Sequence, residues 1–320
     1  MTTTPGFNHP AYLVGQFGTP IWGVANTPPF TGNYFWVDES NGSDGNTGGP
    51  SDPFAALKQA LSFCTANNND VIFMSGSVHV TATVAWNKAK THLIGLSPPS
   101  QNSRARIAIS GTSAVTPLVN VTASGCLFQN IEGYNGVNAA STQVTWANAA
   151  SQNYYKNCNF IQTGDATAAA QAGSRALTVT GDENLFEYCT IGGDTNVRAT
   201  NQNYTLEFLG GSARNIFRGC TFQMLSSLAT NGHVNVGASG IDRYALFDNC
   251  AFINAIESTG TTLNAAIYAN AAAGGAVLLT PTSISLGATA IATTGPVYFV
   301  GVNPGGANSA STGSIAIKAT

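Results

Sequence analysis

Three acids in turns of the second half of the chain have the clearest potential for chemistry. Asp182 and Glu183 lie in the stretch TGDENLF, Asp242 lies in SGIDRYA, and Arg214 and Arg243 occupy comparable turns. Two carboxylates on one surface can hydrolyse a glycosidic bond, and a base near acids can abstract a proton in a lyase. Glycan cleavage is therefore one hypothesis for this cluster. Ordinary turn chemistry in a repeat protein is the other.

These turns precede a sequence repeat of about thirty residues. The copies NYYKNCNFI, NLFEYCTIG, NIFRGCTFQ and LFDNCAFIN each place an aromatic residue three positions before a cysteine, and the earlier segment GCLFQNIEG fits the aromatic column. Such a repeat predicts stacked coils that bury their apolar faces against one another. The two columns are Phe128, Tyr155, Phe186, Phe217 and Phe247, and Cys158, Cys189, Cys220 and Cys250.

The spacing within each copy predicts a bend in the chain. A flat strand alternates its side chains, so residues three positions apart cannot both point inward. The residue before each cysteine is Asn157, Tyr188, Gly219 or Asn249. Asn and Gly adopt left-handed backbone conformations at low cost. We therefore expect an all-β fold, a right-handed parallel β-helix whose coils stack about 4.8 Å apart.

The two inner columns have a structural explanation. Stacked aromatic rings stabilise neighbouring coils by roughly 0.5 to 1.5 kcal/mol per pair, and buried thiols behave as small hydrophobic groups. Parallel side chains give poor disulfide geometry, so free thiols are expected. No cysteine pair has the spacing of zinc ligands. The residue after each aromatic alternates in sign and predicts a charge ladder on the outer wall: Lys156, Glu187, Arg218 and Asp248.

A helix is expected at about residues 53–66, where it would cover the open end of the solenoid. Ser51 or Asp52 can cap it, and Pro53 suits its first turn. Acids and amides upstream could hold calcium, although turn chemistry accounts for them without a metal; they are Asp38, Asp44 and Asn46. The residues expected on the covering face are Phe54, Leu57, Leu61 and Cys64.

The stretch from Tyr34 to Leu96 resembles a known family. It reads YFWVDESNGSDGNTGGPSDPFAALKQAL, followed by DVIFMSGSVHV and THLIGL. This is similar to the first strand, Gly/Asp/Asn-rich turn and capping helix of right-handed parallel β-helix proteins of the pectate-lyase-like superfamily. The superfamily includes polysaccharide lyases, glycoside hydrolases and bacteriophage tailspikes, so the resemblance implies the fold but not one function.

The two ends of the chain differ from the solenoid, which is expected over residues 34–277. Residues 1–33 are rich in proline and aromatic residues without periodicity and predict an extended attachment or assembly arm, with Tyr12, Phe17, Trp22 and Phe30 as its apolar anchors. Residues 278–320 contain three short β-like segments. They either finish the solenoid or form a small β module at a trimer contact.

Composition excludes several classes of protein. Only 8% of residues are charged and the net charge is −3, so a nucleic-acid partner is not expected. No apolar run is long enough to span a membrane, and a secretory signal with a basic first segment is absent. No cofactor or metal is expected.

The pattern as a whole resembles bacteriophage virion proteins that decorate a shell. We expect a non-enzymatic capsid decoration or cement protein that is assembled in the host cytoplasm and located on the virion surface. Its partners would be itself, as a homotrimer, and the major capsid protein. The alternative is a tailspike-like protein that binds or cleaves host-surface polysaccharide, with Asp182, Glu183 and Asp242 as its catalytic residues.

Overall fold

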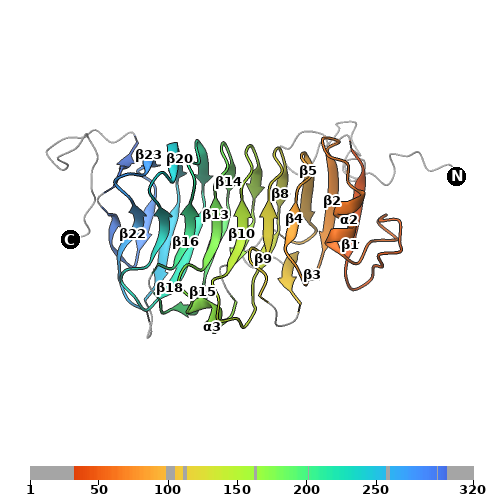
Figure 1. The fold of residues 1–320 in the computed structure, drawn as a ribbon, viewed down its shortest axis with the longest axis horizontal. Helices are drawn as coiled ribbons and strands as arrows, with labels where there is room; N and C mark the ends of the chain where they lie inside the picture. Colours follow the sequence, from red (N-terminus) through yellow and green to blue (C-terminus); the bar gives the residue numbers. More distant parts are fainter. Residues whose placement is uncertain are drawn as a thin grey trace.

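The protein is an all-β, right-handed parallel β-helix, as the repeat predicted (Figure 1). The computed structural model describes residues 32–98, 105–110, 114–161, 164–200, 202–256, 260–293 and 295–300. Every strand pair within its three long sheets is parallel, because the chain passes through the sheets in turn and returns to each one a coil later. No helix among these residues is long and apolar enough to cross a membrane.

Sheet I contains the aromatic column and has ten strands in the described residues. They are β1 (Tyr34–Asp38), β2 (Asp70–Ser75), β5 (Thr91–Gly95), β8 (Leu127–Gln129), β11 (Tyr154–Lys156), β14 (Leu185–Glu187), β17 (Asn215–Arg218), β20 (Ile241–Asp248), β23 (Gly274–Leu279) and β26 (Val297–Phe299).

Sheet II follows sheet I after a tight bend. Its strands are β3 (Ser77–Val80), β6 (Arg106–Ile109), β9 (Glu132–Tyr134), β12 (Asn159–Ile161), β15 (Thr190–Arg198), β18 (Thr221–Ser226), β21 (Ala251–Ala255) and β24 (Ile284–Leu286).

Sheet III completes each coil. Its strands are β4 (Val84–Trp86), β7 (Val119–Val121), β10 (Val144–Asn148), β13 (Arg175–Val179), β16 (Tyr204–Phe208), β19 (Gly232–Val236), β22 (Leu263–Ala269) and β25 (Ala288–Ala292).

The bend between sheets I and II occurs at the residues the sequence indicated. Asn157, Tyr188, Gly219 and Asn249 have φ values of 50°, 54°, 59° and 53°. All four therefore occupy the left-handed region, which Gly and Asn tolerate best. The prediction of a corner is confirmed, and Tyr188 shows that the stacked coils can hold a bulky residue in this conformation.

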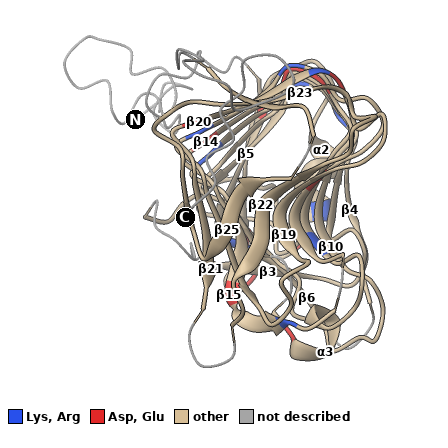
Figure 2. Ribbon diagram, turned by 90° about the vertical axis from the view of Figure 1, so that its left-hand side faces the viewer, with Lys and Arg blue, Asp and Glu red and all other residues tan. Residues whose placement is uncertain are grey.

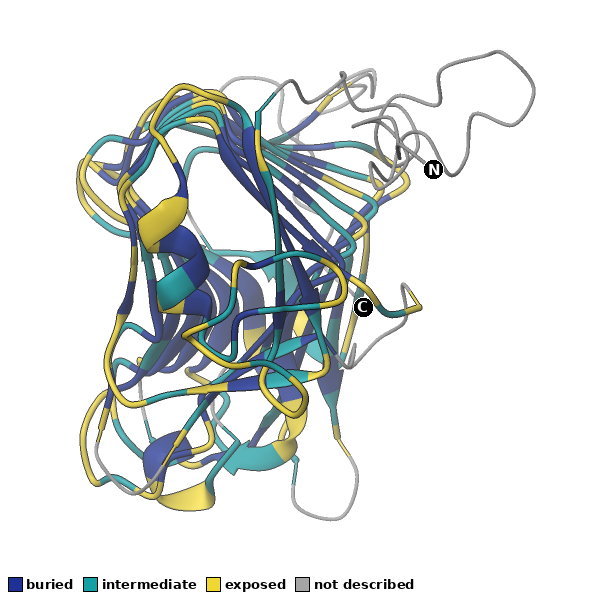
Figure 3. Ribbon diagram, turned by 90° about the vertical axis from the view of Figure 1, so that its right-hand side faces the viewer, coloured by how far each residue is buried: buried dark blue, intermediate teal, exposed yellow. Residues whose placement is uncertain are grey.

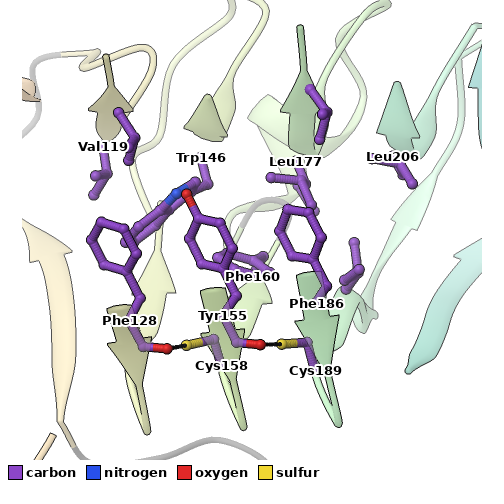
Figure 4. Packing of buried hydrophobic residues seen from close by; sticks show 14 of the residues in the cluster. Val119, Phe128, Trp146, Tyr155, Cys158, Phe160, Leu177, Phe186, Cys189 and Leu206 are labelled. Atoms are coloured by element: carbon purple, nitrogen blue, oxygen red, sulfur yellow. Dashed lines mark hydrogen bonds between the residues drawn. The ribbon is translucent and has the colours of Figure 1, made fainter. Parts of the chain in front are cut away.

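The aromatic column forms a continuous stack inside the solenoid (Figure 4). Tyr155 and Phe186 lie with ring centroids 4.5 Å apart and nearly parallel planes, and Phe186 repeats this geometry with Phe217. The cysteines are buried and free, as expected. Each thiol in the stack contacts a carbonyl of the preceding coil; for example, Cys158 Sγ lies 3.4 Å from the oxygen of Phe128.

Helix α2 (Leu57–Phe63) lies at the N-terminal end of the solenoid, with part of its surface buried (Figure 3). It begins at Leu57, later than expected, and neither Ser51 nor Asp52 caps it. Ala56 occupies the N-cap position without a side-chain cap, and its amide donates to Asp44 Oδ1 at 2.8 Å. Asp52 instead accepts from the amide of Thr47 at 2.9 Å. The expected inner residues Phe54, Leu57, Leu61 and Cys64 are all buried.

The solenoid continues beyond Val277, where the sequence repeat fades. Strands β24, β25 and β26 add one further strand to each sheet, so the chain from 278 to 299 finishes the solenoid. Residues 1–31 of the predicted arm (1–33) and the last residues, 301–320, lie outside the described part of the chain.

Candidate functional site

The outer face of sheet III presents polar and aromatic side chains over successive coils. Thr178, Glu207, Asn235 and Tyr268 occupy equivalent positions on neighbouring strands. They alternate with the inward residues of the same strands, such as the fully buried Leu206. The coil repeat therefore places four different side chains in one row across the sheet.

An ion pair joins the neighbouring strands β13 and β16 at one side of this row. Arg175 Nε lies 3.0 Å from Glu207 Oε2, and Nη2 lies 3.2 Å from Oε1, which gives the two-point geometry of a strong arginine–carboxylate contact. Arg175 and Glu207 side chains are only 6% and 17% exposed. Removing one partner of such a pair would leave an unpaired buried charge and destabilise the fold.

Two tyrosines lie beside the ion pair. The guanidinium of Arg175 lies 4.9 Å above the ring of Tyr204, and the rings of Tyr204 and Tyr268 meet edge to face with centroids 5.6 Å apart. Burial raises the pKa of the Tyr204 hydroxyl, with opposing effects from Arg175 and Glu207, and burial also raises the pKa of Tyr268. Both hydroxyls therefore remain protonated at neutral pH.

These residues surround a hollow of about 450 Å³ on the outer face of strands β13 to β22, which we call the sheet III groove. Uncharged polar side chains complete its lining: Gln202, Asn235, Asn270 and Thr293. Glu207 is the one carboxylate on the described lining. The groove can thus offer a ligand the partly exposed ring of Tyr268, which packs against the buried Tyr204, together with several hydrogen-bonding groups and one acid.

A second, smaller hollow of about 320 Å³ lies on sheet II. Arg106 and Glu132 are joined in it by an ion pair of 2.5 Å, and Arg106 lies 4.9 Å above the ring of Tyr134. Asp194 also lines it, on a stretch of β15 where the register with β18 shifts. Each hollow has one partly exposed tyrosine ring, but the sheet III groove is larger and surrounds its ring with more uncharged polar side chains, so it is the better candidate site for a ligand.

The acids singled out from the sequence lie outside both hollows. Asp182 Oδ1 accepts the amide of Ala213 at 2.8 Å. Glu183 accepts from Gln152 at 3.0 Å and pairs with Arg214 at 2.6 Å, and these contacts, that with Gln152 first, lower the pKa of Glu183. The two acids therefore link turns of successive coils.

Asp242 lies one coil further on. Its carboxylate pairs with Arg243 at 3.1 Å, and both side chains are more than half exposed. Its backbone amide donates to Ser212 at 3.0 Å. The structure thus gives Asp242 a different partner from those of Asp182 and Glu183.

The predicted outer charge ladder is present on sheet I. Arg218 contacts Glu187 at 3.6 Å and Asp248 at 3.1 Å, so it links the coils on either side. Figure 2 shows how few other charged positions the ribbon has. The arm residues Tyr12, Phe17, Trp22 and Phe30 lie outside the described residues.

The acids near the N-terminal helix take part in turns. Asp38 Oδ1 accepts the amides of Ser40 and Asn41 at 3.0 and 3.1 Å, and Asn46 donates to the carbonyl of Pro53 at 2.9 Å. Within the described residues, no group of three or more His, Cys, Asp or Glu side chains is arranged to hold a metal ion.

Sequence reasoning missed the sheet III groove. Glu207 and Asn235 lie in the strand segments TLEF and VNV, at positions that alternate with large apolar residues. That alternation marks them as outward-facing. The missing signal was the depth of the groove, because sequence alone does not show that Arg175 and Glu207 become buried together.

Comparison with solved structures identifies the same fold in polysaccharide enzymes. A pectate lyase matches with a TM-score of 0.56 and 14% identity over 78% of this chain, which spans 62% of that enzyme. A rhamnogalacturonan lyase matches with a TM-score of 0.53 and 16% identity over 79% of this chain and 68% of its own. A pectin methylesterase from Aspergillus niger matches with a TM-score of 0.52 and 16% identity, over 85% and 84%. No protein-family model matches the sequence, and no curated protein matches it significantly.

These structures correct one expectation. The sequence pattern was interpreted as that of a non-enzymatic protein, whereas the named structures are two lyases and an esterase. The expectation of a non-enzymatic protein is therefore wrong as an inference from this fold, because enzymes share it. At these identities the likeness establishes the fold alone, so the activity has to be argued from the site.

Proposed function

We propose that this protein is polysaccharide-active and that it binds a glycan chain in the sheet III groove and acts on it there. The observation that carries the proposal is the nearly buried pair of Arg175 and Glu207 beside the rings of Tyr204 and Tyr268. The fold that the chain shares with pectate lyase, rhamnogalacturonan lyase and pectin methylesterase supports it.

The lining suits the two kinds of surface that a sugar ring offers. The C–H face of a pyranose is apolar and packs against aromatic rings such as that of Tyr268. Its hydroxyl rim needs donors and acceptors, which Asn235, Asn270 and Thr293 supply around the hollow. A groove with both kinds of group fixes the position and the orientation of a chain.

Glu207 is the proposed proton-exchanging group. It is the carboxylate on the described lining, and Asn235 holds its Oε1 at 2.7 Å in addition to the contact with Arg175. These three contacts fix the position of the carboxylate and leave one of its roughly four acceptor positions for a hydroxyl or glycosidic oxygen of a bound chain, as acid–base catalysis requires.

Attachment to a phage shell as a homotrimer remains a separate prediction. It rests on the arm over residues 1–33, nearly all of which lies outside the described residues. Polysaccharide activity and attachment to a shell are compatible, because they would use different parts of the chain.

The proposal is tested with a polysaccharide panel. Electrophoretic retardation in gels containing each polymer measures binding, and the appearance of new chain ends measures cleavage. Wild type is compared with Tyr268→Ala, and with Glu183→Gln as a control outside the groove. We expect at least one polymer to retard the wild type, with about tenfold weaker binding for Tyr268→Ala and no change for the control.

Catalysis has its own variant. Glu207→Gln should abolish cleavage of a polymer that the wild type cleaves, whereas Glu183→Gln should cleave normally. No retardation by any polymer, or retardation that Tyr268→Ala leaves unchanged, would refute a glycan site in this groove.

A further inference from the structure

We infer that the sheet III groove selects a neutral glycan over a polyuronate. This inference rests on the proposed function and names its substrate class. Arg175 and Glu207 are the charged residues on the described lining, and they have opposite signs.

The guanidinium of Arg175 is committed to the protein. Its Nε and Nη2 donate to Glu207, and its Nη1 donates to the carbonyl oxygens of Ser174 at 3.0 Å and Gln202 at 2.5 Å. Four of the five N–H groups of an arginine are thus directed at protein acceptors. A ligand carboxylate would have to displace Glu207 to gain a two-point contact.

Three of the roughly four acceptor positions of the Glu207 carboxylate are likewise taken by the protein. Oε2 accepts from Arg175, and Oε1 accepts from both Arg175 and Asn235. Separating the two partners of a pair buried to this extent would leave uncompensated charges. The loss of stability would be far larger than for an exposed pair. The ion pair therefore stays intact, and the net charge that it presents to a ligand is zero.

A uronate unit would meet two penalties in this setting. Its carboxylate would lose water without gaining a free cationic side chain from the described lining, and it would approach the negative Glu207. A neutral sugar has hydroxyl groups in the same place, which can donate to and accept from the amide groups of Asn235 and Asn270. The described lining of the groove thus offers no free positive charge to an acidic polymer such as pectate.

Matched polymers provide the test. Several polyuronates are compared with their carboxyl-reduced forms, in which each acid has become a primary alcohol and the linkage is unchanged. Binding is measured for the full-length protein, with calcium and with a chelator, because calcium can bridge carboxylates. A panel of neutral glucans, mannans and galactans completes the series.

The expected result is at least tenfold tighter binding of a neutral polymer than of any polyuronate, in both calcium and chelator. Tighter binding of an acidic form than of its reduced form would overturn the inference and leave the proposed function intact. Absence of binding to every polymer would refute the proposed function and the inference with it.

A charge-changing variant gives an independent readout. Glu207→Gln leaves Arg175 without a counter-charge, so it should gain affinity for polyuronates by about tenfold, and the gain should shrink as salt is added. Glu183→Gln is the matched control, since it makes the same charge change outside the groove and should leave the affinity for polyuronates unchanged. If Glu207→Gln binds polyuronates no better than wild type, the ion pair does not set the preference, and the inference is wrong.

Discussion

Two arginine–carboxylate pairs in this protein have the same chemistry and opposite settings. Arg175 and Glu207 on sheet III are 6% and 17% exposed, whereas Arg214 and Glu183 in the turns before sheet I are 42% and 40% exposed. Each pair joins neighbouring coils. Burial distinguishes them, and burial determines how much each contact contributes to stability.

The two regions also differ in periodicity. Gln152, Glu183 and Arg214 occupy the same turn in successive coils, all with positive φ, and they form one hydrogen-bonded row. On sheet III, the positions that pair across neighbouring strands carry three different residue types: Glu207, Asn235 and Tyr268. A regular row serves the stacking of coils. A row of unlike side chains over a hollow marks a place where the solenoid is used for binding.

The largest expected difference between the regions is in stability. Arg175→Met should lower the free energy of unfolding by roughly 3 to 5 kcal/mol, because Glu207 is left as a nearly buried, unpaired charge. Arg214→Met should change it little, because water solvates Glu183. Chemical denaturation of both variants measures the difference.

A double variant serves as the control for this prediction. Arg175→Met with Glu207→Gln removes the orphaned charge and should recover part of the lost stability. Equal, small losses for Arg175→Met and Arg214→Met would show that burial does not distinguish the pairs.

The next largest effect is the loss of stability at acidic pH, which we expect from a buried histidine of sheet III. His233 on β19 is fully buried, neither ring nitrogen has a hydrogen-bond partner among the described residues, and burial lowers its pKa to about 3. The unfolded chain therefore binds a proton near pH 6.5 that the folded chain rejects. The contribution of His233 to the free energy of unfolding is fully present above pH 6.5. It falls by about 2 to 3 kcal/mol between pH 7 and pH 4.5.

His233→Leu isolates this effect, since leucine does not titrate. Denaturation at pH 7 and at pH 4.5 should show a smaller acid loss for the variant than for wild type. His92, the other buried histidine among the described residues, also has a lowered pKa, about 4, caused first by burial, and it contributes equally to both proteins. An identical acid loss in the two proteins would mean that His233 is protonated in the fold.

The smallest effect is expected in the exposed row. Hydrogen bonds from Gln152 and Arg214 lower the pKa of Glu183, so its contribution to stability is present above the pKa of an ordinary glutamate and is lost as the pH falls through the lowered value. Because the group is exposed, Glu183→Gln should leave the melting temperature nearly unchanged at pH 7 and at pH 3. A clear loss at pH 7 alone would assign this row a larger role than its exposure allows.

The fold was predictable because it repeats. The cysteine and aromatic columns, the corner at Asn157 and Asn249, and the face of helix α2 all follow from spacing, and spacing is a local property of the sequence. The first turn of the helix was not predictable in detail, because the acid that accepts a hydrogen bond from the amide of Ala56 is Asp44, twelve residues earlier.

The site was less predictable because it breaks the repeat. Asp182, Glu183 and Asp242 attracted attention as acids beside arginines, and the structure places them in turn contacts. Glu207 and Arg175 lie 32 residues apart and become partners only when their coils stack. Asn235, which contacts Glu207, comes from one coil further on.

The central claim is that a glycan chain lies in the sheet III groove. The most direct measurement is a crystal structure of the protein with an oligosaccharide of the polymer that it binds best. The account predicts a sugar ring packed on Tyr268, with hydroxyl groups within hydrogen-bond distance of Asn235 or Glu207. Sugar density confined to the sheet II hollow, or to the turns around Asp182, would contradict it.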